Sequence, residues 1–311
     1  MLNSLKKYKI LIIFIFIFAI AGCPKENSSK LPEGYVKTAP LFTNLGDFHY
    51  KVSTKNSIAQ KYFDQGLVLA YGFNHAEAAR SFKEAQKIDP DFAMAYWGEA
   101  LVYGPNINAA MENRNVPKAW AALEKALYKS VNATKKEKDL IKALSKRYTK
   151  QILQDRSNLD LDYANAMREV ASKYKDDADI QILFAESLMN TTPWDYWLED
   201  GSPKEITKEI LSVIENTLLF SPNHPQANHL YIHAIEAVKP WKGEKSADTL
   251  RNLIPGAGHL VHMPSHIYMR VGRFADSYEA NKRAIEADEN YITQCRAQGI
   301  YPLNYYPHNI H

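Results

Sequence analysis

Apolar residues recur at helical spacing along most of the chain after residue 50, and this period restricts the fold more than any other feature. Windows with apolar residues three and four positions apart cover 134–150, 159–174, 178–190, 225–238 and 244–253. No segment shows the alternation of apolar and polar residues that a half-buried strand requires. The sequence therefore predicts an all-α fold.

Small and aromatic residues also mark a repeat of helix pairs. The first unit carries, at characteristic intervals, Gly66, Leu69, Ala78, Phe82, Ala85 and Pro90. In a helix pair the small residues allow close approach, and Phe82 would fill the gap that remains. A second unit begins at Tyr96, is interrupted by a loop from Gly104 to Pro117, and resumes at Ala119. Later units fit around Ile210 and around Gly272.

These positions resemble the signature of the tetratricopeptide repeat (TPR), although Gln65 stands where that repeat usually has leucine. The resemblance covers about residues 56–311 and implies a right-handed superhelical solenoid of antiparallel helix pairs, in which each pair packs only on its neighbours. We assign residues 51–311 to this array. The repeat indicates a fold and is nearly silent about chemistry.

The first residues have the pattern of a targeting signal. Lys6, Lys7 and Lys9 precede a twelve-residue apolar run, Ile10 to Ala21, which is shorter than the roughly 20 residues of a spanning helix. The next residues complete Ile20-Ala21-Gly22-Cys23, which resembles the lipobox of bacterial lipoproteins. That resemblance implies removal of residues 1–22 and acylation of Cys23, for example with palmitate. The alternative is an ordinary signal peptide with an accidental cysteine.

Residues 23–50 would then form a lipidated N-terminus and flexible tether, since they begin polar and are interrupted by Pro and Gly. The expected location is the extracytoplasmic side of the bacterial cell envelope, on either the inner or the outer membrane. Without residues 1–22 the 38 basic residues fall to 35, which equals the 35 acidic ones. This balance offers no basic excess for nucleic acid.

Histidine placement carries the chemical signal. Eight of the 10 histidines lie between residues 224 and 311. His229 and His233 are spaced i, i+4, with Glu236 following, and His262 and His266 repeat that spacing after His259. On a helix such residues share one face, close enough to bind one metal ion. In the TPR register these six positions face the concave groove, so we expect them to converge there.

The segments His229 to His233 and Gly258 to His266 (G-H-L-V-H-M-P-S-H) also resemble a subgroup of bacterial TPR lipoproteins. In that subgroup the chain continues beyond the equivalent of His311, so we expect the array to be incomplete at its C-terminus. Glu186, His308 and His311 are second-rank candidates for the metal or the groove, and Trp194 and Trp197 are candidates for a wall over it.

Imidazoles with one carboxylate suit copper, zinc, iron or nickel. The histidine pair at 229 and 233 has metalloprotease spacing but lacks the adjacent glutamate that would act as general base, so a zincin peptidase is disfavoured. Two functions remain open. In the first, a membrane-anchored TPR lipoprotein uses the histidines for metal binding or metal-dependent chemistry. In the second, it is a scaffold whose groove binds an envelope protein or peptide, without catalysis.

Overall fold

The computed structural model describes residues 29–295 and 301–310. The predicted signal peptide, Cys23 and His311 lie outside this range. Within it the chain is all-α, and its regular elements are α1 (Ser57–Tyr71), α2 (His75–Ile88), α3 (Ala93–Val102), η1 (Asn113–Asn115), α4 (Val116–Lys129), η2 (Ser130–Asn132), α5 (Lys135–Leu144), α6 (Ser157–Lys173), α7 (Ala178–Met189), α8 (Glu205–Phe220), α9 (Pro225–Ile235), η3 (Pro240–Gly243), α10 (Glu244–Leu250), α11 (Gly258–His262), α12 (Pro264–Arg270), α13 (Phe274–Cys295) and α14 (Tyr301–Ile310). The absence of strands expected from the sequence holds throughout the described residues, where extended pairing is limited to isolated bridges.

Local chemistry sets the helix boundaries. Asn56 caps α1 and Asn74 caps α2 through side-chain oxygens, and Thr134 forms a capping box with Glu137 at the start of α5. The helix expected over 134–150 ends at Leu144. Pro264 has no backbone N–H to donate, and the chain from Gly258 to Arg270 divides there into α11 and α12.

Most helices pack on the next one along the chain, and α10 packs on α9 and α12. Phe82 of α2 is fully buried and its ring lies between Gly66 of α1 and Gly98 of α3. A Cβ atom added at Gly98 would lie 2.4 Å from the Phe82 ring, and one at Gly66 would lie 2.7 Å from it. The two glycines are therefore needed for the close approach, as the spacing of small residues and Phe82 predicts.

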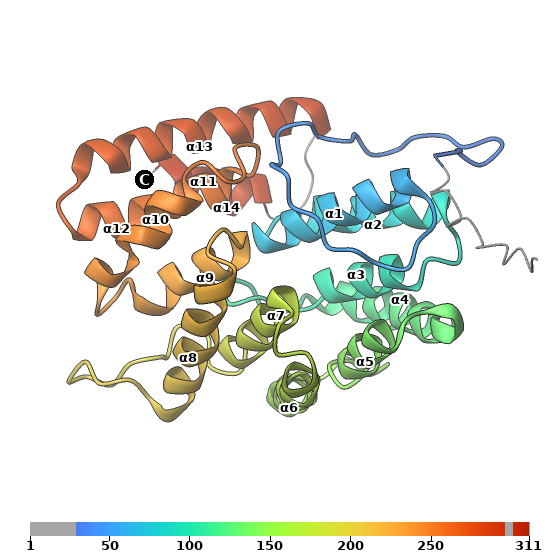
Figure 1. Ribbon diagram of the computed structural model, residues 1–311, viewed down its shortest axis with the longest axis horizontal. Helices are drawn as coiled ribbons and strands as arrows, with labels where there is room; N and C mark the ends of the chain where they lie inside the picture. The colour runs from blue at the N-terminus through green and yellow to red at the C-terminus, as the bar shows by residue number, and fades with distance from the viewer. Residues whose placement is uncertain (1–28, 296–300, 311) are drawn as a thin grey trace, which may run out of the picture.

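The row of helices curls back on itself, so that α9 lies beside α1 in Figure 1 and contacts it. Tyr71, the last residue of α1, donates its hydroxyl to Asp179 of α7 at 2.6 Å. Its carbonyl oxygen lies 2.8 Å from the ring of His229 in α9. The helix faces on the inside of the curl are therefore covered by other parts of the chain.

The segment predicted to be a tether packs on α1 and α2 from about Tyr35 onward, as the blue strap in Figure 1 shows. Glu84 of α2 accepts hydrogen bonds from the Tyr35 hydroxyl at 2.6 Å and the Thr38 hydroxyl at 2.7 Å. Gln65 accepts one from the Phe42 backbone at 2.8 Å. Gln65, which departs from the TPR signature, thus has a local role in holding the strap.

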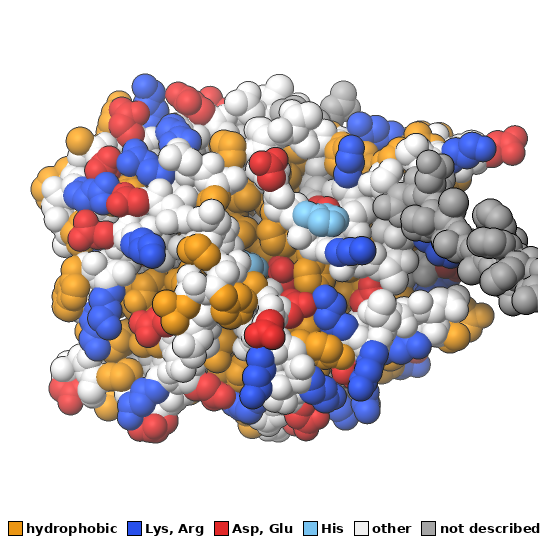
Figure 2. All heavy atoms as spheres, in the orientation of Figure 1, with side chains coloured by type: hydrophobic (Ala, Val, Ile, Leu, Met, Phe, Trp, Pro, Cys, Tyr) orange, Lys and Arg blue, Asp and Glu red, His pale blue; other side chains and the backbone are white. Residues whose placement is uncertain are grey.

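Charged side chains of both signs are interspersed over the face in Figure 2, with apolar side chains gathered between the α9 and α1 sides. This mixed surface agrees with the charge balance of the sequence. Among the described helices, none has the length and apolar character needed to cross a bilayer.

Candidate metal centre

Four helices bring six histidines together. α9 carries His229 and His233, α11 carries His259 and His262, α12 carries His266, and α14 carries His308. Their ring nitrogens form two groups, each with its atoms within 4.8 Å of one another. We call His229, His233 and His259 the inner trio, and His262, His266 and His308 the outer trio.

The inner trio is buried, with His229 and His259 at 0% exposure and His233 at 3%. His229 Nδ1 lies 2.8 Å from the Tyr71 carbonyl oxygen, and His233 Nδ1 lies 3.1 Å from a Glu236 carboxylate oxygen. Because both oxygens only accept, each Nδ1 carries the proton and each Nε2 presents a lone pair. Neither Nε2 has a hydrogen-bond partner, and neither ring nitrogen of His259 has one. A buried polar atom left in this state costs about 1–3 kcal/mol.

The outer trio is more compact. The Nε2 atom of His262 lies 2.9 Å from that of His266 and 3.1 Å from that of His308, and the last two are 3.3 Å apart. Ligand nitrogens about 2.0–2.1 Å from a tetrahedral metal ion stand about 3.3–3.4 Å from one another. The observed distances are therefore close to those of three ligands on one ion.

Hydrogen bonds on the far side of these rings fix where the protons lie. His262 Nδ1 is 2.8 Å from the Asn281 side-chain oxygen, and His266 Nδ1 contacts Glu236. If both Nδ1 atoms donate, the two Nε2 atoms face each other with lone pairs at 2.9 Å. Such an arrangement is repulsive unless a cation lies between them.

A proton could be the cation between these nitrogens, but burial disfavours protonation of the rings. It lowers the pKa of His229, His259 and His262 well below the usual histidine value, and repulsion from neighbouring imidazoles adds to the effect. Burial also lowers the pKa of His233, although Glu236 opposes that shift. These rings are consequently neutral near pH 7, which is the form that binds a metal.

Glu236 lies between the two trios and connects them. One of its oxygens contacts His233 Nδ1 and the other contacts His266 Nδ1. Burial raises the pKa of this carboxyl, but the hydrogen bonds from both histidines outweigh burial and hold the pKa well below its usual value. Glu236 was expected to be a metal ligand. The structure instead places it behind the ligands, where a carboxylate orients imidazoles and increases their basicity.

Phe73 covers the inner trio. Its ring centroid lies 4.7 Å from that of His229, 5.5 Å from His259 and 6.1 Å from His233. The residue has φ +56°, in the left-handed region that a bulky side chain rarely adopts. It occupies the tight turn between α1 and α2, so the fold holds it there at a cost of about 1–3 kcal/mol.

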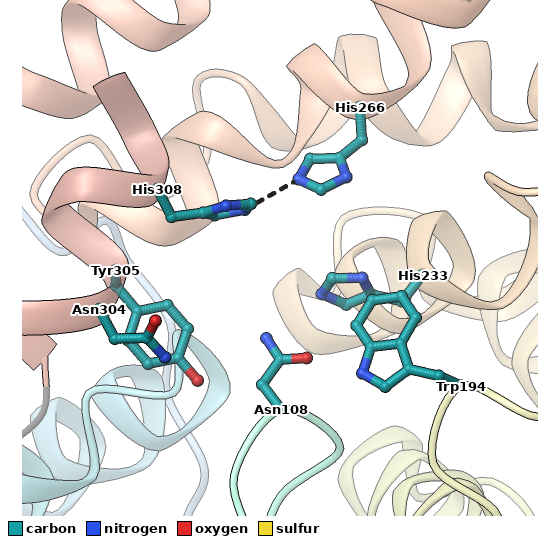
Figure 3. Close-up of a pocket in the computed structure, with 7 residues that line it drawn as sticks. All are labelled: Asn108, Trp194, His233, His266, Asn304, Tyr305 and His308. Atoms are coloured by element: carbon teal, nitrogen blue, oxygen red, sulfur yellow. Dashed lines mark hydrogen bonds between the residues drawn. The ribbon is translucent and has the colours of Figure 1, made fainter. Parts of the chain in front are cut away.

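A pocket of about 220 Å³ opens at the cluster (Figure 3). The residues that line it are Asn108, Trp194, His233, His266, Asn304, Tyr305 and His308. Trp194 is 51% exposed and packs edge-to-face on His233 at 5.1 Å. Asn108 comes from the loop that interrupts the second repeat. The pocket therefore gives a small molecule access to one ring of the inner trio and two of the outer trio.

The remaining candidates lie apart from this pocket. Trp197 donates its indole N–H to the Ala234 carbonyl at 2.8 Å and so packs against α9. Glu186 lies with Arg147 and His75 in a separate cavity, where burial raises its pKa against the opposing charge of Arg147. Glu186 accepts a hydrogen bond from the Gln226 amide at 3.4 Å, and the Gln226 side-chain oxygen lies 3.0 Å from His229 Nδ1.

Four contributors to the site were not anticipated from the sequence: Asn281, Phe73, Tyr305 and the Tyr71 carbonyl. Asn281 and Tyr305 reach the cluster from α13 and α14, and Phe73 reaches it because the array curls. Nothing in their local patterns distinguishes them. Asn108 had a partial signal, since it lies in the predicted loop rich in Asn.

Comparisons with known proteins add no assignment to this geometry. No protein-family model matches the chain, and a search of curated proteins finds no match.

Proposed function

We propose that this protein binds a transition metal ion through the outer trio, as a lipid-anchored, extracytoplasmic TPR protein. The observation that carries the proposal is the convergence of three Nε2 atoms, 2.9–3.3 Å apart. Asn281 and Glu236 occupy the opposite ring nitrogens of His262 and His266 and thereby turn the Nε2 lone pairs toward one point.

The donor set limits the metal. Neutral imidazoles suit copper, zinc, iron and nickel, whereas calcium and magnesium take oxygen ligands. Glu236 directs both oxygens to histidines, so it does not supply the oxygen-rich site that hard cations need. An ion held by three nitrogen ligands would have at least one further coordination position for a small molecule, as catalytic metal sites require, and two of the three rings, His266 and His308, line the pocket. Metal-dependent chemistry on a small molecule and metal handling are both compatible with such a site.

The TPR and lipoprotein parts of the proposal have separate support. Successive helices pack as pairs, and Phe82 is clasped between Gly66 and Gly98. The Ile20-Ala21-Gly22-Cys23 sequence supports the anchor. A peptide-binding scaffold is less favoured at these positions, because His229, His233, His259 and His262 are at most 4% exposed and have little surface for a peptide to contact.

Metal content tests the proposal. The full-length protein, purified in detergent and incubated with an equimolar mixture of copper, zinc, iron and nickel salts, should retain a transition metal after gel filtration. His266→Ala should lose at least tenfold in affinity for it. His49→Ala is the matched control, because His49 is exposed, pairs with Asp64 at 2.8 Å and belongs to neither trio. Wild-type protein that retains no more metal than His266→Ala would refute the proposal.

A further inference from the structure

The inner trio is a second, separately built set of ligands. It contains four buried ring nitrogens without hydrogen-bond partners, the Nε2 atoms of His229 and His233 and both nitrogens of His259. Its own ligand atoms converge within 4.8 Å, and the outer trio converges on a different point. Ring centroids of different trios are 5.9–6.4 Å apart, as in His233 with His266 and His259 with His308. Among the described residues the ligand atoms that lie within 4.8 Å of one another fall into these two sets of three and not into one set of six, so we treat the trios as two sites.

The charge of the surroundings bears on which ions fit. An imidazole that binds a metal ion does so in its neutral form, so the six ligands would add no charge, and Glu236 contributes one negative charge. Asp288, which lies against Gly258 at the start of α11, accepts hydrogen bonds from Tyr301 at 3.0 Å and Asn309 at 2.6 Å. Burial raises its pKa to about 6, so near pH 7 it contributes most of a second negative charge. Two monovalent ions would bring this group to a net charge close to zero, and two divalent ions would bring it close to +2. At equal distance the repulsion between two divalent ions is also four times that between two monovalent ones.

We propose that the inner trio binds a second metal ion and that the two trios together hold a pair of copper(I) ions. This inference rests on the proposed function, since it presumes an ion in the outer trio. Copper is among the metals that imidazole suits, and copper(I) is its monovalent form, although thiolates and thioethers are the ligands that select copper(I) most strongly. The two ions would share Glu236 behind their ligands and the pocket in front of them.

The pocket has a defined place in this arrangement. His233 of the inner trio and both His266 and His308 of the outer trio line it. Figure 3 shows the rings of His266 and His308 on one part of the pocket wall and His233, with Trp194 beside it, on another, so a small ligand in the pocket would reach rings of both trios.

An anaerobic copper(I) titration against a chromophoric chelator tests the stoichiometry directly. Full-length protein should bind two equivalents, and His49→Ala should also bind two. His229→Ala/His259→Ala should bind one, retained by the outer trio, and His266→Ala/His308→Ala should bind one, retained by the inner trio.

The outcomes separate the two proposals. No copper in the wild type defeats the proposed function. One equivalent in the wild type, kept by His229→Ala/His259→Ala, leaves the proposed function standing and overturns the second site. The wild-type stoichiometry does not depend on any variant folding, and circular dichroism melting identifies variants that do not fold.

A zinc titration tests the charge reasoning. The first zinc ion should bind, and the second should bind at least tenfold more weakly than the first, because Glu236, the carboxylate between the two trios, offsets only one of the four positive charges that two zinc ions add. Two zinc ions of equal affinity would overturn the assignment to copper(I).

Discussion

Replacing Glu236 by glutamine changes one carboxylate oxygen into an amide nitrogen and should disable one of the two trios. Both Glu236 oxygens accept from histidine, one from His233 Nδ1 and one from His266 Nδ1. In Glu236→Gln the remaining oxygen can still accept from one ring, but the amide NH₂ faces the N–H of the other. Two N–H donors cannot hydrogen-bond to each other, so the histidine facing the amide must carry its proton on Nε2 instead of Nδ1. That Nε2 atom then has no lone pair with which to bind a metal ion.

The size of the effect follows from the role of the carboxylate behind the ligand. Loss of such a partner lowers metal affinity about 10- to 100-fold. That range corresponds to about 1.4–2.7 kcal/mol of binding free energy. We expect the loss at one site and a smaller change at the other, because glutamine keeps the shape of the side chain and one of its two hydrogen bonds.

Competition with a chelator of known affinity measures the loss, and long-range ¹H–¹⁵N NMR of the metal-free protein identifies the tautomers. In the wild type, His233 and His266 should both carry the proton on Nδ1, and in Glu236→Gln one of them should carry it on Nε2. Glu215→Gln is the matched control, since Glu215 is an exposed carboxylate on α8 that accepts from the Tyr231 hydroxyl at 2.9 Å. Unchanged affinities and unchanged tautomers in Glu236→Gln would refute the reasoning.

Four further predictions concern the cluster and the fold. Asn281→Leu should weaken metal binding about tenfold in the same competition assay, because His262 Nδ1 loses its acceptor at 2.8 Å. The stability of the metal-free protein should fall as the pH drops below about 6.5. Burial lowers the pKa of His229 and His259 in the folded protein, so on acidification these histidines take up protons in the unfolded chain first, which favours unfolding. The free energy of unfolding in urea at pH 7.5 and at pH 5.5 measures this difference. Adding a chelator to protein equilibrated with free metal ion at 100 times Kd should lower its melting temperature, because about 2.7 kcal/mol of stabilisation is lost, and the same chelator should not change the melting temperature of metal-free protein. Phe82→Ala should cost about 3–5 kcal/mol in urea unfolding, because the ring is fully buried between two glycines; a loss below 1 kcal/mol would contradict that packing.

The sequence predicted the helical class because the 3.6-residue period is a local property. Apolar spacing placed helices close to α6, α7 and α9, and the errors are at the ends, where capping and turns decide. The continuous helix expected over 134–150 ends early at Leu144, because the following turn is stabilised by bonds such as Arg147 N–H to the Leu144 carbonyl rather than by further helix.

The histidine cluster was partly predictable for the same reason. The i, i+4 spacing puts His229 with His233, and His262 with His266, on common helix faces whatever the tertiary fold. The partition into two trios was not predictable. It pairs His259 with α9 and His308 with α11 and α12, and these contacts depend on how the later helices stack. The role of Glu236 also depends on tertiary structure, since sequence spacing alone does not distinguish a ligand from the partner of a ligand.

The curl of the array explains why the site is enclosed. An extended row of helix pairs would leave the first-helix faces open to solvent, but here the end of α1 reaches α9 and places Phe73 and the Tyr71 carbonyl against the inner trio. The carbonyl sets the His229 tautomer, and Phe73, held at φ +56°, excludes water from the same rings. The outer trio keeps its access through the pocket beside Trp194. The fold thus supplies two sets of imidazole ligands that differ in their exposure to solvent. An ion bound by the outer trio should therefore be removed by an added chelator before one bound by the inner trio.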